Sequence, residues 1–208
     1  MTNTFTVTLG GILIASVMFT APAAASSPVN LDNPAFAPVN GPTSIPVGAA
    51  DFCKRDTGAC LPNGRVVELE TLTQTSWGQL TAVNDQVNAT IIPETDEDNY
   101  RLAEFWSYPE DGRGDCEDIA LQKQKQLIAD GWDPSTLLMT VVREHDGNGH
   151  AVLMVRTDRG DLVLDNQNGK VLVWKDTNYE FIKRQSQADA GKWVGLNDDR
   201  ATIMAAAN

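Results

Sequence analysis

The stretch Gly112-Arg-Gly-Asp-Cys-Glu-Asp118 decides the fold of this chain. Its glycine turn leads into a helix that we predict over Asp115–Ala129, with Asp115 as N-cap and Asp118 in the capping-box position. Cys116 then lies in the first helical turn, where free backbone N–H groups and the positive end of the helix dipole favour a thiolate. Because a thiolate attacks carbonyl carbons, the pattern indicates a nucleophile. The simpler alternative is a buried structural cysteine.

The first 25 residues predict a signal peptide. An apolar centre, Leu9–Ala15, is followed by the small-residue cleavage signal Ala23-Ala24-Ala25. The segment is too short and too weakly anchored for a strong membrane span, so we expect no span in the mature chain. No Lys or Arg precedes the apolar centre, which departs from the usual signal peptide and leaves a buried N-terminal segment as the alternative.

Composition predicts one acidic domain behind a linker. The 208-residue chain carries a formal net charge of −12, and that charge argues against nucleic acid or an anionic membrane as partner. Residues 26–47 are rich in Pro, Asn and Ala and predict an extended tether. Residues 48–208 are long enough to form a single domain with one core.

Cysteine usage fits an oxidising compartment. The chain has three cysteines, and Cys53 and Cys60 are close enough in sequence to close a short disulfide loop around Gly58. Two unpaired thiols are the alternative. If the disulfide forms, Cys116 is the thiol that remains.

A nucleophilic thiol needs a base, and the chain has only two histidines. His145 lies in a turn composition, whereas His150 opens a β-rich run. The apolar runs and turn signals that surround His150 predict an antiparallel meander. Its strands are Leu137–Val142, His150–Thr157, Asp161–Asp165 and Lys170–Trp174.

The register of this meander places Asp165. If the loop is Thr157–Gly160, Arg156 pairs with Asp161, and Asp165 becomes a diagonal neighbour of His150. A tighter turn would move Asp165 one pair further away. A carboxylate near His150 can hold one imidazole nitrogen and leave the other for the thiol. A cysteine at a helix start, with His and Asp on facing strands, is a papain-like layout and predicts an α+β fold.

Six motifs carry a resemblance to a known family. They are Phe52-Cys53…Cys60, Gly112–Asp118, Gly149–Leu153, Arg156–Asp161, Leu164–Asn166 and Lys183–Ser186. Together they resemble the bacterial transglutaminase-like cysteine peptidases. The resemblance implies a transglutaminase/papain-like fold, with N-terminal helices and the nucleophile helix packed on an antiparallel sheet. It also implies that Cys116, His150 and Asp165 form the catalytic triad.

The resemblance extends to LapG-type periplasmic proteases. Those relatives are calcium-dependent and cut surface adhesins under the control of an inner-membrane regulator. We therefore expect a periplasmic enzyme whose substrate is a protein, with an adhesin and an inner-membrane regulator as expected partners. In these relatives the two acids that flank the cysteine are calcium ligands, which are Asp115 and Glu117 in this sequence.

Charge around the thiol gives an independent reason to expect Ca²⁺. Asp115, Glu117 and Asp118 crowd Cys116 with negative charge, which opposes thiolate formation. A cation would relieve that conflict, and carboxylates are preferred ligands of Ca²⁺. The alternative is that these acids only cap the helix and complement its dipole.

The expected reaction is peptide hydrolysis through a thioester. An acyl transferase, in which a lysine amine replaces water, would use the same three residues. A catalytically silent binding or assembly protein that keeps the fold is the alternative from another class.

Overall fold

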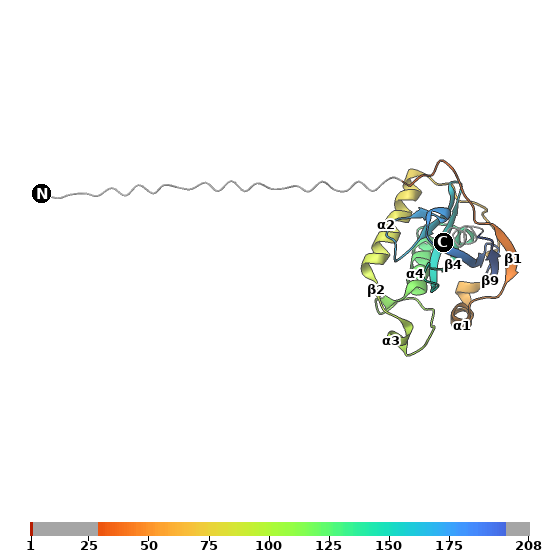
Figure 1. The fold of residues 1–208 in the computed structure, drawn as a ribbon, viewed down its shortest axis with the longest axis horizontal. Coiled ribbons are helices and arrows are strands. Elements are labelled where there is room, and N and C mark those ends of the chain that lie inside the picture. Colours follow the sequence, from red (N-terminus) through yellow and green to blue (C-terminus); the bar gives the residue numbers. More distant parts are fainter. Residues whose placement is uncertain (2–28, 199–208) are drawn as a thin grey trace.

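The computed structural model describes Met1 and residues 29–198, so the predicted signal peptide after Met1 lies outside the described residues, as does the end of the chain after residue 198. The described chain forms a mixed helical and antiparallel α+β fold, as predicted (Figure 1). No helix among the described residues is long and apolar enough to cross a membrane.

One antiparallel sheet organises the domain. Its strand order is β1-β9-β8-β4-β5-β6-β7. The strands are β1 Val39–Thr43, β4 Leu137–Arg143, β5 Gly149–Thr157, β6 Gly160–Leu164, β7 Leu172–Val173, β8 Glu180–Ser186 and β9 Asp189–Leu196. A separate pair joins β2 Ile92–Pro93 to β3 Arg113–Gly114 in parallel.

Within residues 29–198, four α-helices accompany the sheet: α1 Val47–Arg55, α2 Gln74–Thr90, α3 Asp96–Tyr100 and α4 Cys116–Ala129. α4 packs against β5 and β4, and α2 packs against α4. Ile119 and Leu127 of α4, Leu80 of α2 and Val152 of β5 are almost fully buried in one core. This packing fixes the start of α4 against the sheet.

The predicted meander is confirmed. β4, β5, β6 and β7 are consecutive neighbours in the sheet, and Arg156 pairs with Asp161 as the predicted loop requires. The fourth strand is shorter than predicted, because only Leu172–Val173 pairs with β6.

The segment predicted as a tether joins the sheet. Within residues 26–47, Val39–Thr43 forms β1 and pairs with β9. Before it, the Ala37 N–H donates to the Asp161 carboxylate (2.8 Å), and the Asp161 N–H donates to the Ala35 carbonyl (2.8 Å). The segment is extended, but its second half covers the open edge of β9 and belongs to the domain.

Cys53 and Cys60 form a disulfide, with their Cα atoms 5.5 Å apart. The bond ties the end of α1 to a short 3₁₀ turn, Thr57–Cys60. Cys116 is the free cysteine.

Two glycines provide a matched test of the β5–β6 hairpin. Gly160 has a φ of +107°, and a Cβ there would lie 2.7 Å from the Ala35 carbonyl oxygen. We expect Gly160→Ala to lower the free energy of unfolding by about 1–3 kcal/mol. Gly78 lies on an exposed face of α2, and a Cβ there meets no atom within 4 Å. Gly78→Ala should raise stability by about 0.5–1 kcal/mol. Urea unfolding measures both, and equal effects would contradict this hairpin geometry.

Candidate active site

Cys116 is the first residue of α4 and is half-buried. Its thiol donates to Oε2 of Glu117 (3.1 Å). Burial raises the pKa of the Cys116 thiol well above its ordinary value, and the Glu117 charge adds to the rise. A hydrogen bond from the Ala151 N–H acts in the opposite direction. The thiol therefore lies against β5, next to the residue that follows His150.

His150 is buried at the start of β5, and a carboxylate holds its ring. The Nε2 atom lies 2.9 Å from Oδ1 of Asp165, which follows the last residue of β6. Burial raises the pKa of Asp165, but hydrogen bonds from His150, Tyr179 and the Gln167 backbone outweigh it and hold the pKa below the ordinary value. An ionised Asp165 can only accept, so Nε2 carries a proton and Nδ1 is left to act as a base.

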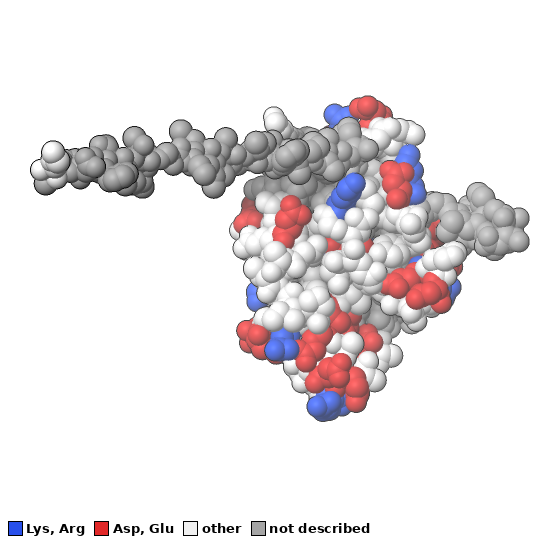
Figure 2. All heavy atoms as spheres, turned by 60° about the vertical axis from the view of Figure 1, so that its left-hand side comes forward, with Lys and Arg blue, Asp and Glu red and all other residues white. Residues whose placement is uncertain are grey.

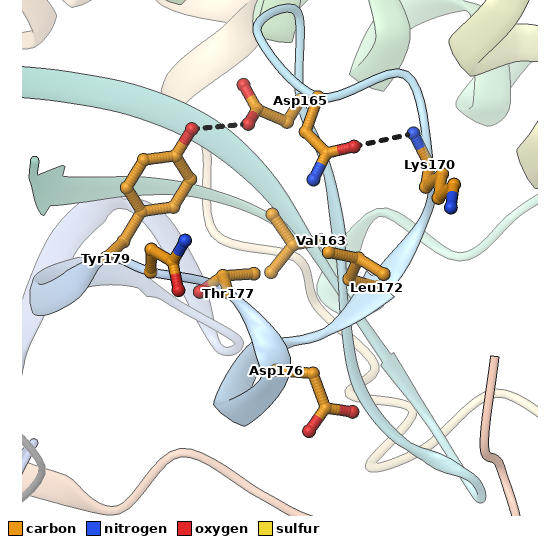
Figure 3. A pocket seen from close by; sticks show the side chains of 9 residues that line it. Val163, Asp165, Lys170, Leu172, Asp176, Thr177 and Tyr179 are labelled. Atoms are coloured by element: carbon orange, nitrogen blue, oxygen red, sulfur yellow. Dashed lines mark hydrogen bonds between the residues drawn. The ribbon is translucent and has the colours of Figure 1, made fainter. Parts of the chain in front are cut away.

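Tyr179 completes the support of Asp165. Its hydroxyl donates to Oδ2 (2.6 Å), as Figure 3 shows, and its ring packs against His150 with centroids 5.3 Å apart. Asp165 and Tyr179 line a pocket of about 210 Å³ together with Val163 and Leu172. Tyr179 precedes β8, and no sequence pattern connected it to the site.

Gln167 and Glu144, from two loops, lie next to the pair formed by Asp165 and His150. The Gln167 N–H donates to Oδ1 of Asp165 (3.0 Å), and its side-chain amide donates to Oε1 of Glu144. The same Glu144 oxygen lies 3.9 Å from Nδ1 of His150. Gln167 lies between two of the predicted strands, Asp161–Asp165 and Lys170–Trp174, and the sequence gave no sign of either contact.

The predicted capping box at the start of α4 is wrong. Asp115 occupies the N-cap position but makes no side-chain capping bond. The carboxylate of Asp118 instead accepts from the Ser107 N–H (2.6 Å). Both acids lie in a carboxylate cluster with Asp96, the first residue of α3. The predicted capping box does not form because the Asp118 carboxylate bonds the Ser107 backbone, in a distant segment, instead of the backbone N–H of Asp115.

The carboxylate cluster, Asp96, Asp115 and Asp118, has the properties of a cation site. One oxygen from each acid lies within 4.8 Å of the other two. In each acid one carboxylate oxygen is buried and has no hydrogen-bond partner among the described residues. Burial, together with the charges of Asp115 and Asp96, raises the pKa of Asp118 to about 8. Unpartnered buried carboxylates are costly, and a hard cation such as Ca²⁺ compensates that cost.

Glu117 contacts the thiol and lies next to this cluster. Asp115, Cys116 and Glu117 also bring one ligand atom each within 4.8 Å of one another, so Asp115 belongs to both groups. Burial and the Asp115 charge raise the pKa of Glu117 above its ordinary value. The structure thus adds Asp96 and Asp118 to Asp115 and Glu117 as acids able to hold a cation.

A comparison with family models identifies the family to which this chain belongs. A family model described as "Bacterial transglutaminase-like cysteine proteinase BTLCP" matches residues 39–201. No curated protein sequence matches the chain significantly.

Solved structures of LapG from Legionella pneumophila resemble the chain. The calcium-bound form is 23% identical with a TM-score of 0.50, and the match covers 64% of this chain and 81% of that one. A second LapG structure is 25% identical with a TM-score of 0.49, over 64% of this chain and 75% of that one. The first match supports a shared fold.

The arrangement predicts that the reactivity of Cys116 depends on His150. Under non-reducing conditions, iodoacetamide should label only Cys116, because Cys53 and Cys60 are bonded. His150→Ala should slow labelling at neutral pH by at least about ten-fold, because no base then offsets the raised pKa of the thiol.

His145→Ala is the matched control, since His145 lies exposed in the loop between β4 and β5. Labelling should be unchanged in this variant. Equal rates in His150→Ala and wild type would show that the two side chains do not act together.

Proposed function

The chain belongs to the bacterial transglutaminase-like cysteine proteinase family and is a cysteine peptidase, and we propose that Cys116, His150 and Asp165 are its catalytic residues. The observation that carries this proposal is the bond between Nε2 of His150 and Asp165, which leaves Nδ1 as the proton acceptor. The Cys116 thiol is hydrogen-bonded to the backbone N–H of Ala151, the residue that follows His150 in β5.

The reaction follows from these positions. His150 Nδ1 takes the thiol proton, and the sulfur of Cys116 attacks the peptide carbonyl carbon. When the C–N bond breaks, the imidazolium gives its proton to the leaving amine, and a thioester remains. His150 then takes a proton from water, and the water oxygen attacks the thioester carbon. The C–S bond breaks, the acid is released, and the imidazolium returns the proton to the sulfur of Cys116. The Cys116 backbone N–H, at the start of α4, is the proposed donor to the oxyanion.

We propose that the enzyme is exported and acts in the periplasm. The signal-like first 25 residues support export, and the Cys53–Cys60 disulfide is typical of an oxidising compartment. A periplasmic or surface protein is the proposed substrate, and the family resemblance favours an adhesin and an inner-membrane regulator as partners.

We propose further that the carboxylate cluster binds Ca²⁺. The calcium-bound LapG structure makes Ca²⁺ the first ion to test. Figure 2 shows Asp and Glu side chains, with fewer Lys and Arg among them, at the lower end of the molecule, where α3 lies in Figure 1, and an excess of negative charge attracts cations. Asp96, Asp115 and Asp118 would hold the ion, and Glu117 lies beside them. The positive charge of the Ca²⁺ ion would offset the negative charge next to Cys116.

The peptidase proposal is tested by comparing protein termini. Exported and surface proteins from wild-type cells should contain a new N-terminus and the matching C-terminus that are missing from Cys116→Ala cells. Loss of the thiol removes the nucleophile, so cleavage should be abolished. If wild-type cells instead contain a Cys116-dependent cross-link to a lysine amine, acyl transfer is the reaction. No difference between the two strains would contradict both.

Calcium binding should stabilise the folded chain. At free Ca²⁺ one hundred times above the Kd, linkage predicts about 2.7 kcal/mol of added stability, seen as a higher melting temperature that a chelator reverses. Asp118→Asn should abolish this shift. Glu97→Gln is the matched control, because Glu97 is an exposed acid on α3, next to Asp96. A melting temperature unchanged by Ca²⁺ in the wild type would rule out this site.

A further inference from the structure

Two asparagines of α2 hold the loop that carries Asp165. The Asn88 side-chain amide donates to the backbone carbonyl of Asp165 (2.8 Å), and the Asn84 amide donates to the carbonyl of Gly169 (3.0 Å). The two bonds lie one helical turn apart on α2 and fix both ends of the loop 165–169. The two bonds connect α2 to Asp165, which is far away in sequence.

The loop needs this support because the sheet does not provide it. The β5–β6 pairing ends at Leu164, and the next paired residue toward β7 is Leu172. Asp165 therefore lies just beyond the last ladder hydrogen bond. Its carboxylate must nevertheless remain 2.9 Å from the His150 ring, and such a position is kept by supporting hydrogen bonds.

Stability alone does not explain these polar residues. Asn84 is fully buried on a helix face that also carries Leu80, Val83 and Val87. Its Oδ1 atom, like that of Asn88, is buried without a hydrogen-bond partner among residues 29–198. A buried unpartnered amide oxygen is costly, and an apolar side chain would avoid that cost. Departures of this kind concentrate at functional sites.

A buried lysine of α4 also interacts with Asp165. Lys123 of α4 is 1% exposed, and burial lowers the pKa of its ammonium group to about 7. The negative charges of Asp165 and Asp85 act in the opposite direction. The ammonium group therefore attracts Asp165 from the helix that also carries Cys116.

We propose that Asn88 and Asn84 are positioning residues for Asp165, acting through the backbone of its loop. The proposal rests on the triad proposed above. It assigns α2 a role in the reaction, although none of its residues needs to touch the substrate.

The test measures Cys116 alkylation by iodoacetamide at neutral pH in the calcium-loaded full chain. Asn88→Ala should slow it about five-fold, the rate equivalent of one ordinary hydrogen bond. Gln86→Ala is the matched control, because Gln86 is an amide on the same helix that bonds Gln126 instead of the loop (3.3 Å). It should leave the rate unchanged.

A double-mutant cycle separates positioning from a general structural effect. In an Asp165→Ala background, Asn88→Ala should cause no further slowing, because the group that it positions is gone. An unchanged rate in Asn88→Ala, or the same five-fold loss in both backgrounds, would overturn the proposal. If Asp165→Ala alone does not change the alkylation rate, the result contradicts the proposed catalytic triad rather than the positioning role of Asn88.

Thermal unfolding accompanies each variant, so that a lost fold is recognised. If Asn88→Ala is unfolded, Asn84→Leu serves in its place. It removes the bond to Gly169 but fills the buried site with an apolar side chain. This variant should keep or raise the melting temperature while it slows alkylation. A rate equal to wild type in a folded Asn84→Leu protein would contradict the proposal.

Discussion

Buried negative charge at the start of α4 is the constraint on which the site depends. A helix start favours a thiolate, but here Asp115 and Glu117 bring carboxylate oxygens to the half-buried thiol, and Asp115 also belongs to the carboxylate cluster. Glu117 even accepts a hydrogen bond from the Cys116 thiol, which stabilises the protonated form of the sulfur. The helix dipole is worth too little to overcome several buried carboxylates. A cation in the carboxylate cluster and an imidazolium at His150 are the two positive charges that would restore a thiolate.

The rest of the domain fixes the positions of the imidazole and of the carboxylates around Cys116. The sheet positions His150, the Asp165 loop orients it, and Tyr179 and Asn88 fix that loop from two sides. α3 brings Asp96 next to Asp115 and Asp118 at the start of α4. Asn88 and Asp96 each carry a buried oxygen without a hydrogen-bond partner among residues 29–198. Such an atom lowers the stability of the fold, and its role in the site explains why it is present.

The sequence predicted the features that local patterns determine. The glycine turn predicted the start of α4, and the turn signals predicted the meander with the correct pairing of Arg156 and Asp161. Asp96, Tyr179 and Asn88 were missed, because each reaches the site from a distant segment through packing that no short pattern records. The capping box failed for the same reason. Asp118 satisfies the local rule but bonds Ser107.

The most direct test follows the ultraviolet absorbance of the Cys116 thiolate while Ca²⁺ is titrated into the metal-free protein at neutral pH. Cys116 is the free thiol, so the signal belongs to one residue. The account predicts that absorbance rises with calcium, saturates, and disappears after alkylation, with no rise in Asp118→Asn. A thiolate signal that is the same with and without calcium would contradict it.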